Sequence, residues 1–194
     1  MKEKFLKGLK WLFNSYIWLA VLLLIIDIIT KRLIIHFGVT PDTQIADWGF
    51  VRINYILNYN AAFGLGTSNE TLSRILYLVI ASAIVIGLII YISLKYKTIK
   101  PYVKACLMLV IAGAIGNMID RIFYSPYHAV VDWIDFYWFW DYNFNIADCC
   151  IVISAFMLLF YVIVIEVKEL IAKRNKELAE EKAQEEAKKD ENKE

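Results

Sequence analysis

Histidine and cysteine are scarce in this sequence of 194 residues, which contains 2 His and 3 Cys. His36 and His128 lie in separate segments and no HExxH motif occurs, so the pattern argues against a zinc hydrolase. Cys106, Cys149 and Cys150 all lie inside apolar runs. Because their spacing matches neither a metal site nor a disulfide framework, we expect them to be small packing residues.

Charge is missing from four long stretches of the chain. They are residues 11–26, 75–94, 105–119 and 149–165, with 16, 20, 15 and 17 uncharged residues. With 59% hydrophobic residues and a mean hydropathy of +0.50, the chain is too apolar for an ordinary soluble domain. Each stretch can reach the roughly 20 residues that span a bilayer, and backbone in lipid must be helical. The sequence therefore predicts an all-α membrane protein, a single bundle of four transmembrane helices.

The first stretch resembles a cleavable signal peptide in its position. It lacks a small-residue cleavage site and runs on into Asp27 and Lys31. We therefore expect it to stay in the mature protein as the first span.

Basic residues are nearly absent from two of the connecting segments. Arg52 is the only Lys or Arg between Leu33 and Ser73, and residues 122–143 contain none. The opposite ends of the spans are basic, with Lys2, Lys4, Lys7, Lys10, Lys95, Lys97, Lys100, Lys104, Lys168, Lys173, Arg174 and Lys176. The positive-inside rule then predicts that both termini are cytoplasmic and that loops at about 37–72 and 123–143 lie outside.

The end of the chain differs in composition from the rest. Residues 168–194 carry 8 basic and 9 acidic side chains, which is typical of a solvated helix or a disordered segment. We expect residues 1–167 to form the four-span membrane domain and residues 168–194 a charged cytoplasmic tail. We assign the tail no chemistry, with partner binding as the alternative.

Polar residues of the spans gather near the predicted outer ends. They are Asp27, Lys31, Asn117, Asp120, Arg121, Asn145 and Asp148, with Asp132 and Asp135 in the loop before the last span. Within the first and third spans they are three or four residues apart and share a helix face. Gly113 and Gly116 let a neighbouring helix approach. Because a charge facing lipid costs roughly 3 kcal/mol or more, the polar faces are expected to meet inside the bundle; ion pairs that merely anchor the helix ends are the alternative.

The outer loops have their own pattern. Residues 51–66, VRINYILNYNAAFGLG, alternate loosely between polar and apolar and end in small residues, which predicts short strands and a turn. Residues 135–144, DFYWFWDYNF, are dense in aromatic side chains that settle at the headgroup level. Together they are expected to form a small, half-buried extracytoplasmic β platform.

Two aspartates at such a site can act as an acid–base pair. Carboxyl groups that share a site do not both ionise easily, so one keeps a proton while the other accepts one. Such a pair can activate a water molecule and protonate a leaving amine, which hydrolyses a peptide bond. Asp132, expected on a loop, and Asp148, at a helix start, are the best candidates, and Asp120 competes with them.

Other functions fit the residues less well. A Cys149–His128 nucleophile pair lacks a clear base, and Thr30 and Lys31 are adjacent and point to different helix faces. An ion-coupled transporter is the main alternative, but its site usually lies near the midplane between broken helices. A non-catalytic adaptor acting through the tail leaves the outer aspartates unexplained.

Five motifs, in order along the chain, resemble those of one family. DIITK (27–31), NYNAAFG (58–64), GAIGNMIDR (113–121), VVDWID (130–135) and FNIAD (144–148) resemble D-x-x-[ST]-K, N-x-G-A-A-F, G-x-x-G-N-x-x-D-R, V-V-D-F and F-N-x-A-D. Over roughly residues 11–167 the chain is similar to the lipoprotein signal peptidases, also called signal peptidase II. These are aspartic peptidases of the bacterial plasma membrane.

The resemblance implies an activity and a site. It implies a peptidase that cuts prolipoproteins just before a diacylglyceryl-modified cysteine, without metal or cofactor. Its partners would be these substrates, membrane lipid and globomycin-type cyclic peptides that occupy the site, and not nucleic acid. It also implies that Asp132 and Asp148 are the catalytic pair, that Asn58, Asn117, Arg121 and Asn145 line or brace the site, and that Asp27, Lys31 and Asp120 are further motif positions.

Four features depart from the family pattern. Asn60 replaces a glycine, although Asn also tolerates left-handed backbone. Trp133 replaces a phenylalanine and adds bulk beside Asp132, while Cys149 stands where serine is common. The spacer at residues 122–129 is a little longer than usual.

Overall fold

The computed structural model describes residues 2–59, 69–124 and 126–191. Its elements are α1 (Lys2–Ser15), α2 (Ile17–Gly38), β1 (Thr43–Asp47), β2 (Arg52–Asn58), α3 (Glu70–Lys95), α4 (Pro101–Phe123), β3 (Val130–Asp135), β4 (Asn143–Phe144) and α5 (Ile146–Glu191). The chain divides into two compact units, Met1–Ala155 and Phe156–Glu194. Most of the described chain is helical, with one small sheet. Helix α5 continues to Glu191. Of the two predictions for the charged tail, a helix or a disordered segment, the described part is therefore a helix.

Three of the described helices are long and apolar enough to cross a membrane. They are α3, α4 and the segment Ile146–Leu178 of α5. Helices α1 and α2 are long and apolar enough for a fourth span only when they are taken together, and a bend of 64° separates them. The stretch 11–26, which the sequence predicts as the first span, is therefore divided at Tyr16. Tyr16 adopts a φ of 60°, a left-handed conformation that interrupts helical hydrogen bonding.

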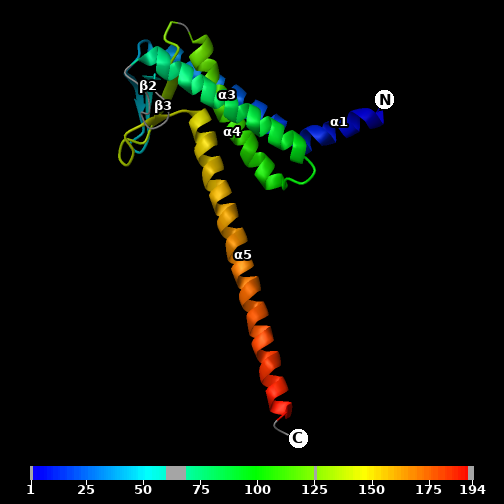
Figure 1. Ribbon diagram of the computed structural model, residues 1–194. Helices are drawn as coiled ribbons and strands as arrows, with labels where there is room; N and C mark the ends of the chain where they lie inside the picture. The colour runs from blue at the N-terminus through cyan, green and yellow to red at the C-terminus, as the bar shows by residue number, and fades with distance from the viewer. Residues whose placement is uncertain (1, 60–68, 125, 192–194) are drawn as a thin grey trace. The chain divides into compact units, whose positions relative to one another are not determined.

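Helix α4 is packed against both α2 and α3, and Figure 1 shows α3 and α4 side by side. Their apolar faces form one buried cluster that includes Val85 and Met108. The glycines of α4 make a second contact. A Cβ atom at Gly116 would lie 2.6 Å from Oδ2 of Asp27 and 3.1 Å from Cβ of Ala147. The helices approach closely here because Gly116 has no side chain, as its spacing from the polar residues predicts.

The four strands form one antiparallel sheet in the order β1-β2-β3-β4. Strands β2 and β3 lie next to each other in Figure 1, with Asn58 opposite Val130 and Ile56 opposite Asp132. Side chains two residues apart share a face of the sheet, so Asn58 and Asp132 point the same way. The strand expected before the motif NYNAAFG is thus present. The turn predicted at residues 60–66, with Asn60, lies outside the described residues.

Asp132 belongs to a strand, and the prediction that a loop carries it is wrong. Val130, Val131 and Asp132 are all buried, so both faces of this part of β3 are covered. Val131 packs with Ile34 of α2 and Tyr55 of β2. A strand buried on both faces shows no alternation of polar and apolar residues. The short segment VVDWID therefore lacks the pattern that marks an exposed strand.

The aromatic segment before α5 is tied to the turn between β1 and β2. The indole N–H of Trp138 donates to the carbonyl of Phe50 at 2.9 Å, and the hydroxyl of Tyr137 donates to the carbonyl of Gly49 at 2.5 Å. The rings of Trp138 and Phe50 nevertheless stay largely exposed. These contacts leave an apolar aromatic surface at this end of the sheet, as the composition predicts.

Candidate active site

Asp132 lies on β3 with 2% of its surface exposed. Its Oδ1 accepts a hydrogen bond from Nδ2 of Asn145 at 2.6 Å, and its Oδ2 accepts one from Nδ2 of Asn58 at 2.9 Å. Burial, and next the negative charge of Asp148, raise the pKa of Asp132 to about 7, although both amide hydrogen bonds act to lower it. The Asp132 carboxyl can therefore gain or lose a proton near neutral pH.

Asp148 lies in the first turn of α5 and is partly exposed. Its Oδ1 accepts from Nδ2 of Asn117 at 2.7 Å, and its Oδ2 from the backbone N–H of Asn145 at 3.3 Å. In return, the backbone N–H of Asp148 donates to Oδ1 of Asn145 at 2.9 Å. This reciprocal pair is a capping box, which starts the helix and fixes the carboxylate at once. The spacing N-x-x-D in FNIAD encodes it.

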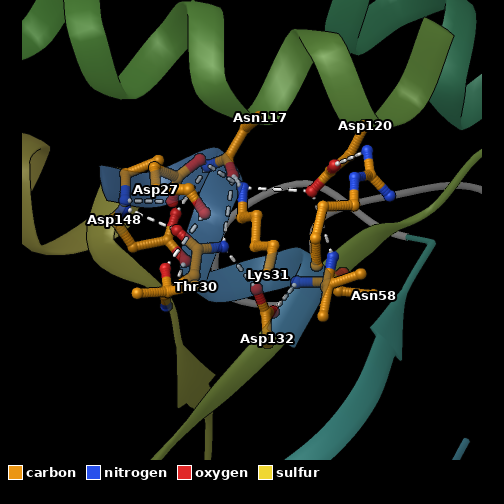
Figure 2. Close-up of polar contacts among 12 residues, drawn as sticks. Asp27, Thr30, Lys31, Asn58, Asn117, Asp120, Asp132 and Asp148 are labelled. Carbon is orange, nitrogen blue, oxygen red and sulfur yellow. Dashed lines mark hydrogen bonds and ion pairs between the residues drawn. The ribbon is translucent and has the colours of Figure 1, made fainter. Parts of the chain in front are cut away.

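Asn145 is the point where the two carboxylates meet. Its side-chain Nδ2 donates to Asp132, its backbone N–H donates to Asp148, and the residue is fully buried. The same Nδ2 also donates to Oδ1 of Asn117 at 3.1 Å. One residue thus holds a carboxyl from β3 and a carboxyl from α5 in the same site. Figure 2 shows Asp132 and Asp148 within this network of polar contacts.

A buried cation contacts one of the site's amides (Figure 2). Lys31 is buried. Its ammonium lies 2.8 Å from Oδ2 of Asp27, 3.0 Å from Oδ2 of Asp120 and 3.0 Å from Oδ1 of Asn117. Because Oδ1 of Asn117 receives donors from Lys31 and Asn145, its Nδ2 is the group left to face Asp148. Lys31 therefore sets the orientation of an amide that contacts a carboxylate.

The structure brings most of the predicted residues into one network. Asn58, Asn117 and Asn145 contact the two carboxylates, and Asp27, Lys31 and Asp120 form the ion cluster behind Asn117. The roles assigned to these residues stay predictions.

Two other predicted groups behave differently. Arg121 is buried and stacks on the ring of Tyr77 at 3.8 Å from the centroid. Thr30 donates its hydroxyl to the carbonyls of Ile26 and Asp27 on its own helix, which does not favour a dyad with Lys31.

Three contributors were not foreseen from the sequence. Arg32 lies 3.3 Å from Oδ1 of Asp120, Tyr77 stacks on Arg121, and the backbone N–H of Ala147 donates to Oδ1 of Asp27 at 2.9 Å. Arg32 directly follows the motif lysine, which is the one sequence signal that could have indicated it. Tyr77 lies in an otherwise apolar stretch, and a backbone donor leaves no trace in composition.

Within residues 2–59, 69–124 and 126–191, no group of three or more His, Cys, Asp or Glu side chains is placed to hold a metal ion. The acidic residues of the site instead face amides and the ammonium of Lys31.

The long apolar helices are those of a multi-pass membrane protein. Its sheet and α5 bring two carboxyl groups onto one asparagine. Two neighbouring carboxyl groups are the arrangement on which aspartic proteases rely. The chain belongs to the signal peptidase II family, since the family model Signal peptidase (SPase) II matches residues 19–164. It is therefore an aspartic endopeptidase of the signal peptidase II type.

Individual relatives and solved structures agree with this membership. The lipoprotein signal peptidase of Symbiobacterium thermophilum is 32% identical over 153 residues, which cover 77% of this chain and 95% of that protein. The lipoprotein signal peptidase of Vibrio cholerae is 35% identical over 156 residues, covering 78% and 85%. A solved "Bacterial membrane enzyme structure by the in meso method at 1.9 A resolution" is 28% identical, with a TM-score of 0.64 and coverage of 76% and 92%.

Proposed function

We propose that this enzyme removes signal peptides from prolipoproteins whose lipobox cysteine carries diacylglycerol, by cutting the peptide bond just before that cysteine. The family and the name shared by its relatives, lipoprotein signal peptidase, support the substrate class. The observation that carries the proposal is the convergence of Asp132 and Asp148 on Asn145.

The two aspartates act on one water molecule. With a pKa of about 7 for Asp132, the pair can hold one proton near neutral pH. The ionised carboxylate takes a proton from the water as its oxygen bonds to the scissile carbonyl carbon. The protonated carboxyl then gives its proton to the leaving amide nitrogen as the C–N bond breaks. The proton balance is restored at the end of the turnover, and no covalent intermediate forms.

The supporting residues keep the two carboxyls in place. Asn58 and Asn145 donate to Asp132, and Asn117 donates to Asp148. Lys31 holds the amide of Asn117 in the productive orientation.

The remaining motif residues surround this cluster. Asp27 and Asp120 balance the charge of Lys31, each within 3.0 Å of its ammonium. We assign Arg121, buried against Tyr77, to the wall of the site.

The chain crosses the bacterial plasma membrane four times in this proposal, with the bent pair α1 and α2 as its first span. Both termini are cytoplasmic, and the sheet and the site lie at the outer face. Residues 1–167 form the membrane domain and residues 168–194 the cytoplasmic tail. The distribution of Lys and Arg supports this orientation. The acyl chains of the substrate then lie in the outer leaflet and hold the scissile bond at the depth of the aspartates, where globomycin-type cyclic peptides also bind.

The test is cleavage of a lipidated precursor by the purified full-length enzyme in detergent. Asp132→Asn and Asp148→Asn should each lower turnover by about a hundredfold or more, read as loss of the faster-migrating product. Asp141→Asn, an exposed aspartate of the segment before α5, is the matched control and should cut normally. Normal turnover by either site variant refutes the acid pair, and loss of activity with a chelator, restored by zinc, refutes the metal-free mechanism.

A further inference from the structure

A cavity lies among the helices, apart from the aspartates. Its volume is about 520 Å³, within the range of ligand pockets (roughly 300–1,000 Å³). The wall is made by α2, α3 and α4 and by the end of α1. On α2 it uses residues that precede Asp27, and on α4 residues that precede Asn117. The cavity therefore lies toward the ends of the helices that the loop between α3 and α4 joins.

The wall of this cavity suits a hydrocarbon chain. Most of its residues are aliphatic, with Ala20 and Ala112 leaving room beside them. Its two serines are already engaged, because Ser15 Oγ donates to the carbonyl of Leu12 at 2.8 Å and Ser93 Oγ donates to the carbonyl of Ile89 at 2.7 Å. A polar occupant would lose its hydrogen bonds to water with little in return.

The rim of the cavity carries positive charge. Tyr96 lines the cavity, and the ammonium of Lys104 lies over its ring, 3.9 Å from the centroid. Lys104 is only 8% exposed, and among the residues that the structure describes it forms no ion pair with a carboxylate. Exposed lysines precede it in the chain, with Lys95 at the end of α3 and Lys97 and Lys100 in the loop before α4. A buried ammonium without a carboxylate partner among the described residues, with further lysines close to it in the sequence, matches an anion at this position.

The start of α5 does not occupy this face of α4. Ser154 Oγ donates to the carbonyl of Cys106 at 2.8 Å, and Ala147 packs on Gly113. The cavity is lined by Met108, Ile111, Ala112 and Ile115 of α4, which lie on a different side of the helix.

We propose that this cavity binds one acyl chain of an anionic phospholipid, whose phosphate group meets Lys104 and the neighbouring loop lysines. The apolar wall selects the hydrocarbon, and the lysines select the charge of the headgroup. The site is separate from the aspartates and does not rest on the proposed cleavage reaction.

The experiment is native mass spectrometry of the full-length protein, purified in detergent and titrated with phosphatidylglycerol or phosphatidylcholine of the same acyl chains. We expect one phosphatidylglycerol to be retained at least fivefold more tightly than phosphatidylcholine. Lys104→Gln should weaken the binding of phosphatidylglycerol about fivefold, since a lysine near a lipid surface contributes on the order of 1 kcal/mol to the binding free energy. Lys104→Arg should keep the binding, and Lys173→Gln, a change of the same charge elsewhere, should leave it unchanged.

Two further variants separate the wall from the rim. Ala20→Phe fills the cavity and should reduce retention of both lipids, whereas Ala83→Phe, on the exposed face of α3 and outside the wall, should not. If Lys104→Gln does not fold, as judged by size-exclusion chromatography and circular dichroism, the double variant of exposed Lys97 and Lys100 to Gln takes its place. The proposal is overturned if the protein retains phosphatidylglycerol and phosphatidylcholine equally, or if Ala20→Phe and Ala83→Phe retain lipid equally. Either result identifies the bound lipid as non-specific.

Discussion

Replacing Asp132 by asparagine should make the protein more stable at high pH while it loses activity. The carboxyl is 2% exposed and its pKa is raised from 3.8 to about 7, chiefly by burial. Because the folded protein binds this proton more tightly than the unfolded chain, the contribution of Asp132 to stability is complete below pH 3.8. It is lost as the pH rises toward 7.

The size of the effect follows from the linkage relation. Between pH 5 and pH 8 the wild-type protein should lose about 2–3 kcal/mol through this one group. Asparagine cannot ionise and escapes that loss. Its NH2 group would face one of the two amide donors of Asn58 and Asn145, which costs about 1–3 kcal/mol at every pH. This constant cost cancels when the two pH values are compared.

The assay is thermal unfolding of the detergent-purified protein, followed by tryptophan fluorescence at pH 5, 6.5 and 8. Relative to the wild type, the midpoint of Asp132→Asn should rise by about 5–10 °C between pH 5 and pH 8, since 1 kcal/mol shifts Tm by about 2–4 °C in a protein of this size. Asp141→Asn, with an exposed side chain, should follow the wild type. A difference between Asp132→Asn and wild type that is the same at all three pH values would refute the raised pKa.

Two other changes test the packing behind the carboxylates. Gly116→Ala should lower Tm and turnover together, because its Cβ would meet the Asp27 carboxylate at 2.6 Å; Gly87→Ala, whose Cβ has open space, should be neutral or slightly stabilising. Lys31→Met should cost about 3–5 kcal/mol, because it leaves the buried carboxylate of Asp27 without its cation and that of Asp120 with only the partly exposed Arg32. Both are read by thermal unfolding, and an unchanged midpoint for Gly116→Ala or Lys31→Met would contradict the structure.

Most of the helices, and the convergence of their polar residues, were the predictable part of this molecule. Long runs without charge identify spans from composition alone, and spacing of three or four residues places polar groups on one helix face. The motif FNIAD also determines where α5 begins, because Asn145 and Asp148, three residues apart, form reciprocal capping hydrogen bonds. Such signals are short-range in sequence, so a single chain reveals them.

The features that the sequence did not reveal depend on distant contacts or on backbone conformation. The break at Tyr16 occurs at a residue that is neither Gly nor Pro, so composition gives no warning. The strand that carries Asp132 is buried on both sides and lacks alternation. Arg32 acts on Asp120, a residue 88 positions away. Each of these needs the assembled fold to be recognised.

The ion pair of Asp27 and Lys31 also bears on how the protein is made. The two residues are one helical turn apart on α2, whereas Asp120 and Ala147 are synthesised much later. In the proposed four-span arrangement, α2 enters the lipid during translation before these later partners exist. Because Asp27 and Lys31 can neutralise each other within α2, the nascent helix carries no isolated charge in the bilayer before α4 and α5 are inserted.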